Sequence, residues 1–437
     1  VIEALYQKDQ EAGQVTDPRL LIKCNVDQFY GIEIEEFPAQ IAQLALWLVD
    51  HQVNLRVSEL FGNPFEDFGM TDLVTGAGSG DAGNLFGGHA FLVAFCIITV
   101  ALVSGAVADR ARFWPWMLFA TLFTTFVVFP TFRWIWGVDA DGNFYGWLAN
   151  DVWGLGQGAL DWAGGTVIHQ SAGAAALALA LVLGKRKIGF SKEETVAHNV
   201  PLVLIGAAIL WFGWFAFNAG AAGTAEQAGL IWINTLVAPS AAMLGWLLTE
   251  RIRDKHATSL GAASGAVAGL VAITPACANV SPVWAIVIGF VAGICSALAV
   301  GLKYRLRMDD SLDVIGVHLV SGVVGTVALG FVALPSEGTA GLFYGGGFGL
   351  LLTQVVAVLV SVVYCAVLTF VIAFVIDKTI GFRITERDEI DGIDITQHAE
   401  SGYALAGDAT GSFSPGRHAA GEDASSFEPG RSEPVHS

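Results

Sequence analysis

Long apolar runs separated by short polar loops dominate the chain from about residue 89 to residue 376. A helix needs roughly 17–25 apolar residues to cross about 30 Å of hydrocarbon. Nine segments meet this requirement and predict nine transmembrane helices. They are His89–Ala108, Phe113–Trp136, Ala163–Gly184, Asn199–Ala222, Gln227–Thr249, Ser259–Ala276, Trp284–Leu302, Val314–Leu334 and Gly346–Ile376.

The loops between these segments alternate in charge. Lysine and arginine follow the first, third, fifth, seventh and ninth segments, whereas the loops at 137–162, 223–226, 277–283 and 335–345 contain neither. Basic loops remain on the cytoplasmic side of a membrane. The alternation therefore predicts a cytoplasmic C-terminus and supports the count of nine.

Composition agrees with a membrane protein that has polar ends. Only 14% of residues are charged, where soluble domains average about 25%. The net charge of −18 divides into −6 for residues 1–62, −5 for 63–376 and −7 for 377–437. An acidic chain offers no basic surface for phosphates, which argues against nucleic-acid binding. The five cysteines show no metal-ligand spacing.

Two histidines lie inside predicted spans, where ionisable residues are costly and are candidates for function. His169 and His318 are each preceded by a β-branched residue and followed four residues later by glycine. Asp161 precedes the first histidine by eight residues, and Asp313 precedes the second by five. The two histidines are five spans apart, which predicts an inverted repeat with a site at its interface. Structural hydrogen bonding between helices and haem ligation remain alternatives.

Aromatic residues concentrate in the fourth predicted span, between Trp211 and Phe217. Phe91 and Phe95 lie one helical turn apart in the first span, and Trp136 ends the second. Packing and interfacial anchoring explain most of these rings. The functional alternative is a pore whose rings attract a cation through their π faces.

The same segments resemble the Amt/MEP/Rh ammonium transporter family. The matching strings run from about Phe91 to Tyr403 in the family's order. They are Asp161-Trp-Ala-Gly-Gly-Thr-Val-Ile-His169, Gly213-Trp-Phe-Ala-Phe-Asn-Ala-Gly220, Thr274-Pro-Ala-Cys277, Gly316-Val-His318 and Gly392-Ile-Asp394 through Glu400.

The resemblance implies an all-α polytopic membrane protein, an inverted-repeat helix bundle that works as a homotrimer in the plasma membrane with one ammonium or ammonia pore per subunit. It implies no enzyme activity, cofactor or metal, and a PII-type signalling protein as a cytoplasmic partner. The family has eleven spans, so the first two have no counterpart here. The implied roles are pore lining for His169 and His318, gating for Phe95 and Phe217, ammonium recruitment for Trp136, Phe95 and Ala221 (where the family usually has serine), and structural or electrostatic roles for Asp161, Asp313, Trp214, Asn218 and Thr274.

The two ends of the chain differ from this membrane body. Residues 29–36 predict a strand that carries Glu33, and Pro38 opens a predicted helix, so the two form a predicted short α/β fragment. Residues 25–54 resemble adenine-specific DNA methyltransferases, but that family's glycine-rich loop and Asn-Pro-Pro-Tyr motif do not occur in residues 1–62. We therefore expect a non-catalytic fragment at 1–62, a membrane domain at 63–377, a cytoplasmic segment at 378–403 and a disordered tail at 404–437. An ammonium sensor of the same fold, a methyltransferase and a chimera without function are the alternatives to transport.

Overall fold

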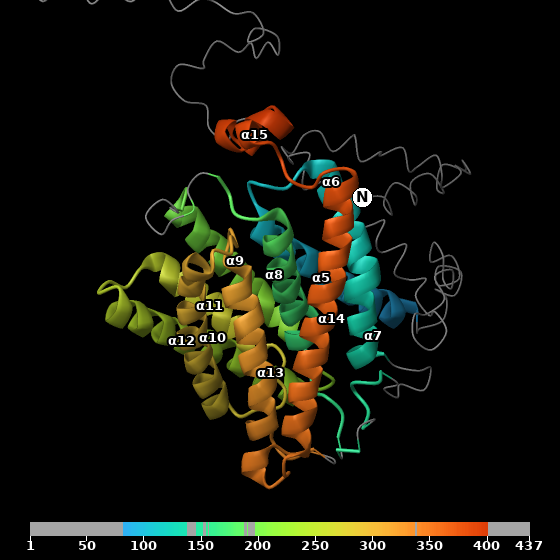
Figure 1. The fold of residues 1–437 in the computed structure, drawn as a ribbon. Coiled ribbons are helices and arrows are strands. Elements are labelled where there is room, and N and C mark those ends of the chain that lie inside the picture. Colours follow the sequence, from blue (N-terminus) through green and yellow to red (C-terminus); the bar gives the residue numbers. More distant parts are fainter. Residues whose placement is uncertain are drawn as a thin grey trace, which may run out of the picture.

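The computed structural model describes residues 82–137, 146–151, 154–155, 157–187, 190, 197–336 and 339–400. These residues form a bundle of helices in which the long α14 packs along α8 (Figure 1). Within the described part, pairing between extended segments is limited to two isolated bridges, Ala111 with Arg383 and Ser336 with Thr339. The predicted all-α membrane architecture is confirmed. The predicted α/β fragment and the tail from residue 404 lie outside the described residues.

Eight helical stretches of the described residues are long and apolar enough to span a membrane. The segment predicted at Ser259–Ala276 is a shorter apolar helix, Ser259–Ile273, because Pro275 has no N–H to continue the helical ladder. The count of nine spans therefore stays a prediction. The elements are α5 (Ala82–Val107), α6 (Phe113–Phe123), η3 (Thr124–Val128), α7 (Phe129–Trp136), η4 (Gly165–Gln170), α8 (Ser171–Leu183), α9 (Val200–Ala219), α10 (Ala225–Arg253), α11 (Ser259–Ile273), α12 (Pro282–Leu306), η5 (Ile315–Leu319), α13 (Val320–Val332), η6 (Leu342–Tyr344), α14 (Gly349–Thr379), α15 (Glu386–Asp391) and η7 (Asp394–His398).

Small residues allow the helices to approach closely. Gly289 and Gly293 of α12 face the backbone carbonyl oxygens of Ala238 and Ala242 in α10, and a Cβ at either glycine would clash with them. In the same bundle, α8 packs against both α5 and α14. Close helix approach through small residues is the main packing device in lipid, because lipid tails are as apolar as the helices.

The two helices that carry the histidines begin in the same way and run in opposite directions. Each starts with π-helical turns, η4 before α8 and η5 before α13. Arg186, three residues past the end of α8, pairs with Asp309, which precedes η5. The end of one helix therefore lies beside the start of the other. This antiparallel arrangement is the one that an inverted repeat requires.

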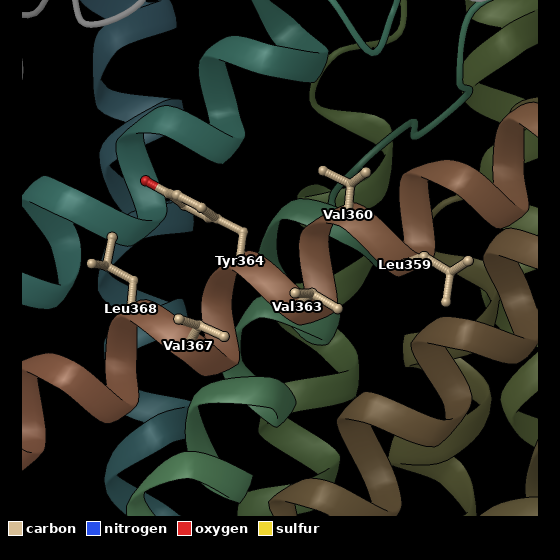
Figure 2. Close-up of a pocket in the computed structure, with 6 residues that line it drawn as sticks. All are labelled: Leu359, Val360, Val363, Tyr364, Val367 and Leu368. Carbon is tan, nitrogen blue, oxygen red and sulfur yellow. The ribbon is translucent and has the colours of Figure 1, made fainter.

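The outer face of α14 carries an apolar hollow of about 600 Å³ (Figure 2). The Tyr364 hydroxyl donates to the carbonyl oxygen of Phe126 at 2.6 Å, so its polar end is satisfied. Exposed Leu359, Val363 and Val367 form much of the lining. This hollow is part of the apolar exterior and lies apart from the buried histidines.

Candidate functional site

His169 and His318 meet in the interior of the bundle. Their Nδ1 atoms are 3.2 Å apart, and the two rings stack with centroids 5.3 Å apart and planes 23° apart. Both side chains are buried. One Nδ1 must carry the proton and donate while the other accepts, so the pair shares one hydrogen along this edge. The Nε2 atom of His169 has no hydrogen-bond partner among the described residues, which leaves a polar atom available to a small ligand.

Asp161 fixes the start of the helix that carries His169. Its Oδ1 accepts the N–H groups of Gly164 and Gly165 at 2.9 and 2.7 Å, and its Oδ2 accepts those of Thr166 and Val167 at 2.8 and 3.2 Å. The first N–H groups of a helix have no partner within it, and a carboxylate there also meets the positive end of the helix dipole. Asp161 therefore sets the position of η4 and of His169.

Gly164 and Gln170 adapt this segment to its surroundings. Gly164 has φ +111°, a left-handed backbone that glycine adopts without a steric penalty. Gln170 Nε2 donates to the Gly322 carbonyl at 3.1 Å and to Thr326 Oγ1 at 2.8 Å. These two bonds tie η4 to α13, the helix that continues from His318.

A buried polar frame supports the histidine pair from α9. The Trp214 indole stacks on the His169 ring, with centroids 5.2 Å apart and planes 17° apart. Its Nε1–H donates to Thr274 Oγ1 at 2.8 Å, and Asn218 Nδ2 donates to Thr235 Oγ1 at 3.0 Å. A buried indole needs such an acceptor, because an unpaired buried donor costs about 1–3 kcal/mol.

Aromatic rings continue from the histidines toward one end of the bundle. Phe217 lies 6.3 Å from His169, Phe95 lies 4.4 Å from Phe217 in an edge-on contact, and Trp136 lies 5.5 Å from Phe95, all between ring centroids. The Trp136 indole N–H donates to the Asp161 carbonyl at 2.7 Å. Five rings from five different helical stretches thus form one continuous series from Trp136 to His318.

Two predicted residues belong neither to this series nor to the polar groups described above. Ala221 is exposed, two residues beyond the end of α9. Asp313 is half-buried and pairs with Lys303, with Asp313 Oδ1 2.6 Å from Lys303 Nζ. Its neighbour Asp310 is the acid that accepts an N–H of the histidine-bearing segment, from Ile315 at 2.6 Å. Sequence reasoning missed Asp310, although the signal was present: Asp310 precedes His318 by eight residues, the spacing of Asp161 and His169.

A sequence model of the Ammonium Transporter Family matches residues 47–403. The chain belongs to the ammonium transporter family. An ammonium transporter of Mycobacterium tuberculosis is 52% identical over 338 residues, which cover 75% of this chain and 69% of the relative. One of Aquifex aeolicus is 45% identical over 318 residues, 72% of this chain and 71% of the relative.

Solved structures agree with this membership. A protein described as "Sensor Amt Protein" superposes with a TM-score of 0.71 at 28% identity, covering 82% of this chain and 87% of that one. Saccharomyces cerevisiae Mep2 superposes with a TM-score of 0.69 at 30% identity, covering 79% and 78%.

A second sequence model, of the MmeI DNA-methyltransferase domain, matches residues 2–72. The resemblance of the first residues to a DNA methyltransferase is therefore confirmed. The two matches overlap between residues 47 and 72. The boundary expected at residue 62 falls inside this overlap and stays a prediction.

Proposed function

We propose that this chain transports ammonium, and that the substrate crosses the bundle as ammonia along the ring series that ends at His169 and His318. The observation that carries this proposal is the buried imidazole pair, joined through Nδ1 at 3.2 Å and in line with the rings of Phe217, Phe95 and Trp136. The 52% identity to a protein named an ammonium transporter supports the substrate class.

The chemistry follows from the surroundings of each group. An ammonium ion is attracted to the π faces of Trp136 and Phe95, where the aromatic rings replace part of its water shell. Removal of the remaining water disfavours the charged form of an amine, so the ion releases a proton and continues as ammonia. The two imidazoles then offer a hydrogen-bond acceptor and donor to a neutral ligand, and a shared hydrogen between them provides a route for a proton.

Uptake of radiolabelled methylammonium into liposomes tests this proposal. We expect His169→Ala to lower uptake at least tenfold, because the neutral ligand loses its buried partner. The matched control is His256→Ala, an exposed histidine in the loop after α10, which should retain the rate of the original chain. Uptake that survives His169→Ala, and that also survives Phe95→Asp with Phe217→Asp, would contradict the proposal.

The environment of the transporter is part of the same proposal. The alternating basic loops support a cytoplasmic C-terminus and a place in the plasma membrane with lipid around the bundle. Family membership supports a homotrimer with one pore per subunit. The segment at 378–403, which includes α15, is the expected contact for a PII-type signalling protein, and no nucleic acid is expected to bind.

Ammonium sensing is the second candidate, favoured by the superposition on a protein named "Sensor Amt Protein". A sensor would bind ammonium without net flux. Two measurements on the same liposomes distinguish sensing from transport. Ammonium binding detected by calorimetry without uptake of methylammonium supports sensing.

We propose no enzymatic role. The match to the MmeI methyltransferase domain ends at residue 72, and the chain contains no Asn-Pro-Pro-Tyr motif. Incubation with S-adenosylmethionine carrying a labelled methyl group and with DNA should leave the DNA unlabelled.

A further inference from the structure

Asp310 occupies the same place relative to His318 as Asp161 does relative to His169. The acid precedes the histidine by eight residues in both cases. Asp310 therefore follows Asp161 by 149 residues, as His318 follows His169. Each acid also accepts the N–H of the residue five positions ahead, Thr166 for Asp161 and Ile315 for Asp310. The correspondence therefore holds in sequence and in hydrogen bonding.

The Asp310 side chain is buried against the first residue of η5. It is 2% exposed, and its Oδ2 accepts the Ile315 N–H at 2.6 Å. His318 follows three residues later in the same π-helical segment. We propose that Asp310 is a positioning residue of the pore, which sets the place of His318 by holding the start of η5, and that its protonation adjusts this hold.

The two acids differ in how firmly they are held. Asp161 accepts four N–H groups with both oxygens. The Asp310 carboxylate accepts the Ile315 N–H with its Oδ2 and is stabilised more weakly by the Val314 N–H, and its Oδ1 is buried without a hydrogen-bond partner among the described residues. An unsatisfied buried carboxylate oxygen is costly when charged. Asp310 is therefore the acid of the two whose charge responds to its surroundings.

Charged groups from four parts of the chain surround this position. From α12, Lys303 Nζ donates to the Asp310 backbone carbonyl at 3.0 Å and pairs with Asp313 at 2.6 Å. The preceding residue, Asp309, pairs with Arg110, three residues beyond α5, and with Arg186, three residues beyond α8. Three cations and three carboxylates thus meet here, and a proton on Asp310 leaves one positive charge in excess.

Burial raises the pKa of Asp310 from 3.8 to about 7, and the neighbouring Asp313 carboxylate adds to the rise, while the Ile315 and Val314 N–H groups and the charge of Lys303 oppose it. Above pH 7 the ionised carboxylate makes a charge-assisted hydrogen bond to Ile315. Below pH 7 the protonated group makes a neutral bond, which is about half as strong. We therefore expect His318 to be held more firmly at pH 8 than at pH 6.

Two measurements test this proposal. The first, methylammonium uptake, rests on the proposed function, and the second, a histidine resonance, does not. Methylammonium uptake is measured in liposomes with equal pH on both faces, at pH 6 and at pH 8, for the original chain, Asp310→Asn and Asp310→Ala. Asparagine keeps an acceptor oxygen but does not titrate. We expect the original chain to exceed Asp310→Asn about threefold at pH 8 and to equal it at pH 6, with Asp310→Ala below Asp310→Asn at both values.

The ratio of the two chains at each pH removes the effect of pH on the ammonium–ammonia balance, which they share. Asp254→Asn, at the end of α10, is the matched control. The uptake rate of the original chain divided by that of Asp254→Asn should be the same at pH 6 and pH 8. A ratio of the original chain to Asp310→Asn that does not change with pH, or full uptake by Asp310→Ala, would overturn the proposal.

The second readout does not need transport. In protein labelled with ¹⁵N-histidine, the His318 signal is assigned by its loss in His318→Ala. We expect this signal to move between pH 6 and pH 8 in the original chain and to stay fixed in Asp310→Asn. A signal that moves equally in both chains overturns the positioning role. Absence of uptake by the original chain refutes the proposed function alone, because the resonance experiment still decides the role of Asp310.

Discussion

Asp309 shows how one side chain can tie distant parts of this bundle together. It is 1% exposed and binds two arginines, with its Oδ2 2.5 Å from Arg110 Nη1 and its Oδ1 2.8 Å from Arg186 Nη2. Arg110 is itself fully buried and donates to the Ala106 and Asp309 carbonyl oxygens. Removal of one partner from such a group leaves buried charge without compensation.

Asp309→Asn should lower the free energy of unfolding by about 3–5 kcal/mol at pH 7, because two guanidinium groups lose their carboxylate. The exposed pair of Arg387 and Asp391 is the control, and Asp391→Asn should cost about 0–1 kcal/mol. Unfolding in detergent by denaturant measures both. Equal effects of the two variants would contradict the assignment of Asp309 as the central carboxylate.

The same carboxylate has a defined pH dependence. Burial acts to raise the pKa of Asp309, but the hydrogen bonds from Arg186 and the charge of Arg110 outweigh it and lower the pKa below 3.8. Because the folded-state pKa is the lower one, the stabilisation is present above about pH 4 and is lost as the pH falls through the folded value. The difference between the original chain and Asp309→Asn should therefore shrink in unfolding experiments below pH 4.

At the scale of helices, glycine positions decide which pairs come close. The contact of α10 with α12 depends on Gly289 and Gly293, because a Cβ at either position would clash with a backbone carbonyl oxygen of α10. The glycine at 206 in α9 has open space around it instead, with nothing within 4 Å of a Cβ built there. The same residue type thus has opposite consequences on two apolar helices.

Gly293→Leu should destabilise the folded bundle by about 1–3 kcal/mol or more, since the added side chain forces α10 and α12 apart. Gly229→Leu in α10 is the matched control and should leave stability unchanged, because nothing lies within 4 Å of a Cβ built at Gly229. The midpoint of thermal unfolding in detergent measures the difference. A similar midpoint for both variants would contradict close packing of α12 on α10.

At the scale of the whole molecule, α9 presents a large apolar surface. Trp214 and Asn218 are the buried residues of α9, whereas Ile209 and Phe212 are 66% and 77% exposed. The two buried residues lie on the inner face of the helix, beside the histidine pair. One helix thus contributes both to the site and to the exterior of the subunit.

We expect the α9 exterior to contact a neighbouring subunit in the proposed trimer. Native mass spectrometry from detergent should show a trimer for the original chain and mainly monomers for Phe212→Gln. Leu359→Gln, on the apolar hollow of α14, is the control and should remain a trimer (Figure 2). A trimer that persists in Phe212→Gln would place the subunit contact elsewhere.

Much of the architecture could be predicted from local sequence, because a bilayer imposes a minimum length on apolar helices. The apolar runs predicted the spanning helices with shifts of a few residues at their ends, apart from the shorter α11. The cost of an ionisable side chain in hydrocarbon singled out His169 and His318. The ring-bearing positions Phe95, Phe217 and Trp136 were also identified in the sequence.

Contacts over long sequence separations were decided only by the tertiary structure. The 3.2 Å approach of two Nδ1 atoms 149 residues apart depends on two π-helical starts and on the antiparallel packing of α8 and α13, which no hydropathy pattern encodes. Whether Asp310 or Asp313 holds the start of η5 depends on which carboxylate reaches the Ile315 N–H, and in the structure it is Asp310. Hydropathy reports the environment of each residue, whereas these contacts depend on how helices pack through glycines and buried ion pairs.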